Sequence, residues 1–122
     1  MEFRQWLESQ TLQIPLADIV ASRRAVVDAF TNFSNGRESR TNGPAEVWQT
    51  EDGHYQLLDG YHRFIAAIVS GRKTLPSEVT EQGRSNYRKV VGPSDRFAYK
   101  PSMTYKDLEH LADMELLADL GD

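Results

Sequence analysis

The sequence predicts an α+β fold in which a small mixed β-sheet is flanked by helices. Short apolar runs bounded by turn residues alternate with segments of helical periodicity, which indicates both kinds of element in one chain. Asp52-Gly53 separates two of these runs and indicates a hairpin of antiparallel strands. The stretch that begins at Tyr55 reads as a strand, a tight turn and a helix that stops at Gly71.

The expected strands are apolar runs at residues 12–16, 45–50, 55–58 and 74–80. The expected helices are residues 2–9, 17–33, the segment from Gly60 to Gly71, and 104–120. Ser22 is placed to cap a second helix inside 17–33, whereas Thr104 and Gly121 mark the start and stop of the last helix. The apolar face of that last helix is expected to contain Leu108, Leu111, Leu116, Leu117 and Leu120.

Two polar, Gly- and Ser-rich stretches read as loops, at residues 34–44 and beyond Glu81. In the second loop, basic residues alternate with Tyr87, Phe97 and Tyr99. Such a pattern suits a surface for nucleotides or single-stranded nucleic acid, and it also suits a loop whose aromatic side chains attach it to the core. We favour the second interpretation.

Length and composition indicate one domain over residues 1–122, with a core at about 12–80 and a C-terminal loop and helix at 81–122. Apolar content of 39% and charged content of 26% are typical of a globular protein. No apolar run approaches the ~18 residues of a membrane span, and the N-terminus is unlike a signal peptide. The absence of cysteine excludes a disulfide framework and a thiolate metal site. We therefore expect a cytoplasmic protein without a membrane partner.

Charge is distributed unevenly along the chain. The net charge of −4 argues against a protein that coats DNA. Residues 72–100 carry seven Lys or Arg against three acidic residues, whereas residues 104–122 carry six acidic residues against one lysine. The asymmetry fits a basic face beside an acidic helix, and it fits two ordinary solvated faces, which we favour.

A candidate anion site lies at the helix that follows Asp59. The first turn of a helix has unpaired backbone N–H groups and partial positive charge, so a cation such as Arg63 is disfavoured there unless an anion is present. Phosphate is the expected anion, held by the N–H groups, His62 and Arg63, with Gly60 permitting close approach. The structural alternatives are that His62 bonds locally and that Arg63 extends to solvent.

These motifs together resemble the ParB/sulfiredoxin-like superfamily, in which a Gly-x-His-Arg box at a helix start binds nucleotide phosphates. Gly60-Tyr61-His62-Arg63 has this form. Residues 14–19 (IPLADI) are similar to the family's opening segment, and residues 43–47 (GPAEV) are similar to its Gly-Pro-x-x-Val strand. The resemblance covers about residues 12–79. It implies a ParB/sulfiredoxin-like fold, a nucleotide such as ATP or CTP with Mg²⁺, and a bacterial or phage setting.

In this family the segment after the first strand can contribute to the ligand pocket. Arg23 and Arg24, at the start of the helix that Ser22 caps, are therefore further candidate phosphate contacts. We consider a solvated surface pair the better interpretation of these two residues.

The chain departs from the family at Tyr61. Sulfiredoxins have their catalytic cysteine at this position, and nucleotide-hydrolysing and kinase members commonly have a glutamate. The chain has no cysteine, which excludes sulfiredoxin activity, and a neutral phenol with a pKa of about 10 is a poor general base. The Glu-Asn-x-x-Arg motif and the helix-turn-helix domain of chromosome-partitioning members are also missing. Asp59, the remaining acidic residue of the site, could hold a metal ion, orient Arg63 or, as we favour, cap the turn.

Three functions follow as hypotheses. The first is a nucleotide- or phosphate-binding domain that uses Gly60, His62 and Arg63, with Asp59 and Tyr61 shaping the pocket. The second is a ParB-like nuclease or nucleotide phosphohydrolase in which Asp59 binds a divalent metal. The third is a non-catalytic interaction module whose first or last helix contacts a partner. Nucleotide is the expected ligand, and a nucleic-acid partner and a homodimer are left open.

Overall fold

The computed structural model describes residues 11–36, 43–80 and 91–120. The helix expected at 2–9, the middle of the loop expected at 34–44, Tyr87 and the stop at Gly121 lie outside the described residues, as does the side chain of Leu120. Within the described ranges, no helix has the length and apolar character that crossing a membrane requires.

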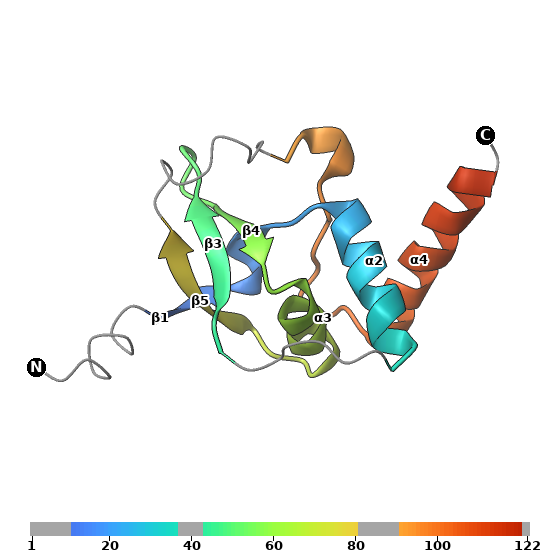
Figure 1. Ribbon diagram of the computed structural model, residues 1–122, viewed down its shortest axis with the longest axis horizontal. Coiled ribbons are helices and arrows are strands. Elements are labelled where there is room, and N and C mark those ends of the chain that lie inside the picture. Colours follow the sequence, from blue (N-terminus) through green and yellow to red (C-terminus); the bar gives the residue numbers. More distant parts are fainter. Residues whose placement is uncertain (1–10, 37–42, 81–90, 121–122) are drawn as a thin grey trace, which may run out of the picture.

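Five strands form one mixed sheet in the order β1-β5-β3-β4-β2 (Figure 1). Their bounds are β1 Thr11–Pro15, β2 Ile19–Val20, β3 Ala45–Gln49, β4 Tyr55–Asp59 and β5 Thr74–Thr80. The β1/β5 and β3/β4 pairs are antiparallel, whereas β3/β5 and β2/β4 are parallel. The predicted mixed sheet is therefore confirmed, and the fold is α+β.

The three α-helices of the described ranges lie to one side of this sheet (Figure 1). They are α2 Arg23–Ser34, α3 Tyr61–Val69 and α4 Tyr105–Leu120, and two 3₁₀ turns lie at Leu16–Asp18 and Pro93–Asp95. α3 contacts β3 and β5, α2 contacts α3, and α4 contacts α2 on its outer side. This order of contacts makes α4 the outermost helix.

The hairpin predicted at Asp52-Gly53 joins β3 and β4. The N–H of Thr50 donates to the carbonyl oxygen of His54 at 2.8 Å, and Gly53 has a φ of +85°. The Asp52 carboxylate accepts a hydrogen bond from the His54 N–H at 3.2 Å. The turn therefore has the two features expected of an Asp-Gly hairpin, a backbone hydrogen bond to the Asp52 side chain and a positive φ at Gly53.

The helix expected over residues 17–33 begins only at Arg23. Ile19 and Val20 form β2, which pairs in parallel with the first two residues of β4. Both side chains are buried, and β-branched residues fit a pleated strand well. The helical prediction was wrong for Ile19 and Val20, because pairing with a distant strand outweighs local helical periodicity, whereas residues 17 and 18 lie in a 3₁₀ turn. Ser22 does cap the helix, and its hydroxyl accepts a hydrogen bond from the N–H of Ala25.

The buried core extends past the expected limit at residue 80. Phe97 is 5% exposed and its ring meets Phe64 edge-on, with 5.8 Å between centroids. The N–H of Phe97 also donates to the carbonyl oxygen of Ala21 at 2.8 Å. Leu108 on α4 is 1% exposed and joins the same core. Attachment of the loop to the core through an aromatic residue is thus confirmed at Phe97.

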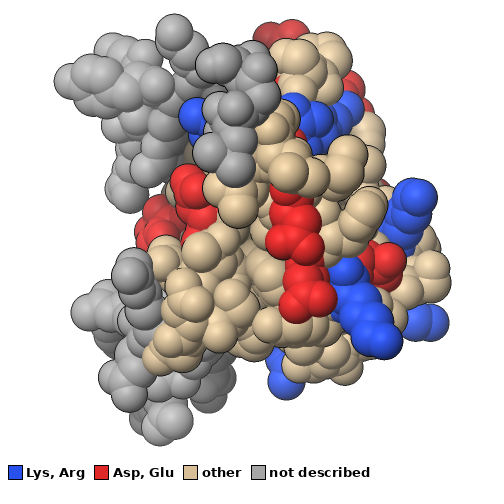
Figure 2. Space-filling model, turned by 90° about the vertical axis from the view of Figure 1, so that its right-hand side faces the viewer, with Lys and Arg blue, Asp and Glu red and all other residues tan. Residues whose placement is uncertain are grey.

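The apolar face expected on α4 is only partly buried. Leu108 is buried and Leu111 is half-buried, whereas Leu116 and Leu117 are 59% and 63% exposed. α4 packs against α2 along one side, and its outer side faces solvent (Figure 2). The prediction was wrong for Leu116 and Leu117 because no further layer of the described structure covers them.

Candidate functional site

Gly60 lies between β4 and α3, where the chain turns sharply into the helix. Its φ is +102°, a left-handed conformation that favours glycine. A Cβ atom added to Gly60 would lie 2.7 Å from the Cβ and 3.0 Å from the Cα of Ala45 on β3. The backbone of Gly60 therefore lies close to the neighbouring strand β3. This packing and the positive φ are sufficient to require a glycine here, without any ligand.

Asp59 ends β4 with its side chain exposed. One of its carboxylate oxygens accepts a hydrogen bond from the N–H of Gly60 at 2.9 Å. This is the turn-capping role that we favoured from the sequence. Among the described residues, no group of three His, Cys, Asp or Glu side chains is arranged to hold a metal ion.

Tyr61 connects the starts of two helices. Its hydroxyl accepts a hydrogen bond from the N–H of Ser22 at 3.1 Å and lies 3.4 Å from the carbonyl oxygen of Leu57, to which it can donate. Burial raises the pKa of the Tyr61 phenol above its usual value of 10.0, despite the hydrogen bond from Ser22, which lowers it. The neutral hydroxyl therefore forms hydrogen bonds within the fold. Because its pKa is raised, it loses its proton less readily than a solvated tyrosine and is a poorer candidate for a general base.

Arg23 and Arg24 lie at the start of α2, where a carboxylate of the chain itself supplies the anion. Asp95 accepts a hydrogen bond from the Ser22 hydroxyl at 2.6 Å and one from the N–H of Arg24 at 3.3 Å. The hydrogen bond from Ser22 is the main reason that the pKa of Asp95 is lowered, and the two arginines lower it further. Arg23 also pairs with Glu115 of α4 at 2.6 Å.

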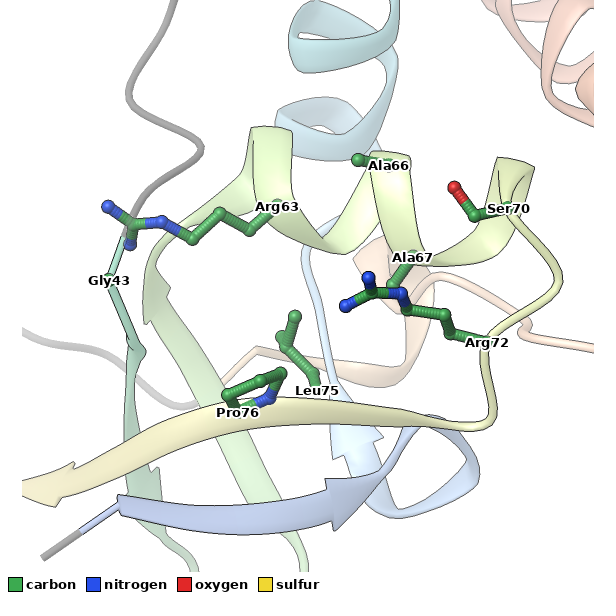
Figure 3. A pocket seen from close by; sticks show the side chains of 8 residues that line it. All are labelled: Gly43, Arg63, Ala66, Ala67, Ser70, Arg72, Leu75 and Pro76. Atoms are coloured by element: carbon green, nitrogen blue, oxygen red, sulfur yellow. The ribbon is translucent and has the colours of Figure 1, made fainter. Parts of the chain in front are cut away.

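Arg63 lines a groove between α3 and β5 that has a volume of about 240 Å³. Arg63 and Ala67 lie one turn apart on α3, Ser70 is the C-cap of the helix, and Arg72 follows it (Figure 3). Arg63 extends toward Gly43, and the guanidinium of Arg72 turns back toward Ala67. The described lining comprises Gly43, Arg63, Ala66, Ala67, Ser70, Arg72, Leu75 and Pro76.

The electrostatics of this groove favour an anion. Two guanidinium groups line it, and its described lining contains no Asp or Glu. One terminal nitrogen of Arg63 donates to the carbonyl oxygen of Pro44 at 2.8 Å, which fixes this side chain between α3 and the start of β3. An arginine held in this way loses little conformational freedom when it binds a phosphate or carboxylate.

The structure separates the residues that the sequence grouped into one site. Of the candidates, only Arg63 lines the groove; His62 is half-buried in the first turn of α3, and no side chain caps that turn. Sequence reasoning missed Arg72 and Asp95 as site residues. Arg72 belonged to the basic stretch that we noted, but its distance from the Gly-x-His-Arg box along the chain gave no reason to single it out.

No protein-family model matches the chain, and no curated protein matches it by sequence. Among solved structures, the chain is similar to the crystal structure of sulfiredoxin from Arabidopsis thaliana, with 16% identity and a TM-score of 0.39. The match covers 83% of this chain and 94% of the sulfiredoxin chain. At this degree of similarity, the function must be argued from the residues of the site.

Proposed function

We propose that the protein binds a nucleotide or another phosphate-bearing ligand, whose phosphate groups lie between Arg63 and Arg72 in the α3–β5 groove. The observation that carries this proposal is the presence of two guanidinium groups in a groove whose described lining has no carboxylate. Guanidinium groups bind phosphate oxygens through paired, charge-assisted hydrogen bonds, which are stronger than those between neutral groups. Two of them on opposite ends of one groove suit a ligand with more than one anionic oxygen.

The remaining lining leaves room for such a ligand. Ala66 and Ala67 are small, and Ser70 contributes an exposed hydroxyl that can donate a hydrogen bond. The volume of about 240 Å³ is below the ~300–1,000 Å³ of sites that enclose whole small molecules. Phosphate groups would therefore occupy the groove, and a nucleoside would lie across its mouth.

Binding without turnover is the form of the proposal that the groove supports best. Its described lining contains no Asp, Glu or His that could act as a general base. The Asp59 carboxylate accepts a hydrogen bond from the N–H of Gly60 within the turn. The Tyr61 hydroxyl, on α3, accepts one from the N–H of Ser22 at the start of α2. His62, in the first turn of α3, is proposed as a second contact to a phosphate that reaches the start of that helix, where the helix dipole favours an anion.

Calorimetric titration with ATP, CTP, GTP and their diphosphates, with and without Mg²⁺, tests the proposal. Arg63→Ala and Arg72→Ala are each expected to weaken binding at least about tenfold, because each removes charge-assisted hydrogen bonds. Lys73→Ala is the matched control. It removes one positive charge from the neighbouring exposed position but changes no residue of the groove lining, so binding should be unchanged.

Circular dichroism and thermal unfolding should first show that each variant is folded. The absence of binding to every nucleotide by the folded protein would overturn the proposal. An equal loss of affinity in Lys73→Ala would indicate general charge attraction instead of a site. A loss in His62→Gln with none in Arg72→Ala would place the phosphate at the start of α3.

A further inference from the structure

Among the residues that the structure describes, α4 contacts the rest of the fold along one side. Leu108 is buried beneath it, and the ring of Tyr105 meets Phe30 of α2 edge-on at a centroid distance of 5.0 Å. Further along, Glu115 pairs with Arg23 of α2. These contacts hold α4 beside α2 and leave a groove of about 430 Å³ between the two helices.

The groove combines an apolar surface with a strongly acidic lining. The apolar part comes from Val27 and Phe30 on α2 and from Ala112 and Leu116 on α4. The described lining includes no Lys or Arg, and its charged residues are Asp28, Glu109, Asp113 and Glu115. Figure 2 shows this side of the molecule, where acidic side chains form a column with uncharged residues along its sides and basic side chains next to its lower end.

Large apolar side chains are exposed at the same end of α4. Leu116 and Leu117 are 59% and 63% exposed, and Met114 is 54% exposed. Leu117 lies one helical turn beyond Asp113, so it continues the surface of the groove outward. Exposed leucines beside acidic residues are typical of a surface that contacts another protein.

We propose that the groove between α2 and α4 binds a basic amphipathic helix of a partner protein. A helix that lies between two others presents apolar residues at positions i, i+3, i+4 and i+7 to such a groove. Lys and Arg beside that apolar stripe would face Asp28, Glu109 and Asp113. A second copy packed through the same face is disfavoured, because it would bring these acidic residues against one another.

This inference is independent of the proposed nucleotide site. The groove that binds the helix is formed by α2 and α4, whereas the phosphate groove is formed by α3 and β5, and the two share no lining residue. Loss of either activity by substitution should therefore leave the other unchanged.

A fluorescent synthetic helix of about 18 residues, roughly five turns, provides the probe. It carries leucine at i, i+3, i+4 and i+7 and lysine or arginine elsewhere, and its binding is measured by fluorescence anisotropy. We expect saturable binding that weakens with added salt. The double variant Leu116→Asn/Leu117→Asn should weaken binding at least about tenfold, as loss of a buried apolar anchor does, and Asp113→Asn should reduce the salt dependence.

Two control variants distinguish binding in this groove from nonspecific hydrophobic or electrostatic attraction. Leu12→Asn removes a leucine that is 47% exposed on β1, and Glu51→Gln removes an exposed carboxylate at the β3–β4 hairpin. Neither change should affect binding of the probe.

Three results would overturn the inference. The first is no binding of the probe by the folded protein. The second is equal binding of a peptide with the same composition but scrambled spacing. The third is self-association in light scattering that disappears in the Leu116→Asn/Leu117→Asn variant, because it would assign the surface to a second copy.

Discussion

The phenol of Tyr61, in the first turn of α3, accepts a hydrogen bond from the N–H of Ser22, the N-cap of α2, at 3.1 Å. The starts of two helices that are far apart in the sequence are thereby joined. The same N-cap donates from its hydroxyl to Asp95, so three distant segments meet at one serine. Tyr61 consequently contributes to the architecture of the fold.

Tyr61→Phe is expected to destabilise the protein without affecting ligand binding. The change leaves the partly buried N–H of Ser22 without its acceptor, which costs about 1–3 kcal/mol in the free energy of unfolding. Urea unfolding measures this loss, and nucleotide titration serves as the control. A weaker nucleotide affinity in a folded Tyr61→Phe variant would contradict the structural role.

Gly60→Ala is expected to be far more harmful than Gly71→Ala, although both glycines have positive φ. At Gly60 the new methyl group would meet Ala45 at 2.7 Å, and the left-handed backbone adds strain; together these should cost more than about 2 kcal/mol. At Gly71 nothing lies within 4 Å, so only the backbone cost of about 1 kcal/mol applies. Thermal and urea unfolding compare the two, and equal losses would contradict the packing argument.

The Ser22–Asp95 contact should make stability depend on pH in the acid range. The pKa of Asp95 is lowered in the folded protein, so its contribution is present above the unfolded value of 3.8 and is lost as pH falls through the lower folded value. Asp95→Asn should reduce stability by about 1 kcal/mol at neutral pH, where it removes an anion from the start of α2. Urea unfolding of both proteins from neutral pH to pH 3 and below should show the difference shrinking with acidification. A constant difference would contradict the assignment.

Leucines on opposite sides of α4 should differ sharply in their effect on stability. Leu108 is 1% exposed, so Leu108→Ala removes core contacts and should cost about 2–5 kcal/mol. Leu117 is 63% exposed, so Leu117→Ala should change stability by less than about 0.5 kcal/mol. Denaturant unfolding measures both changes. A large loss in Leu117→Ala would mean that this side chain is covered in the folded protein.

The sequence predicted correctly those features whose conformation depends on neighbouring residues. The Asp52-Gly53 hairpin, the cap at Ser22 and the strand–turn–helix at Gly60 each depend on neighbouring residues, and each is present in the structure. At the start of α2, beside Arg23 and Arg24, Asp95 of the chain itself supplies an anion. Periodicity alone could not reveal that Ile19 and Val20 pair with β4, because that strand lies far along the chain.

The sequence by itself determined most of the elements and their order, because turn chemistry, capping and hydrophobic periodicity act over a few residues. Only the tertiary structure decided which residues share a site. It brought Arg72 into the same groove as Arg63, joined the Tyr61 hydroxyl to the N–H of Ser22 by a hydrogen bond, and placed Asp95 at the start of α2. It also left Leu116 and Leu117 exposed, because burial depends on which surfaces the fold places against a helix, and a periodic pattern does not contain that information.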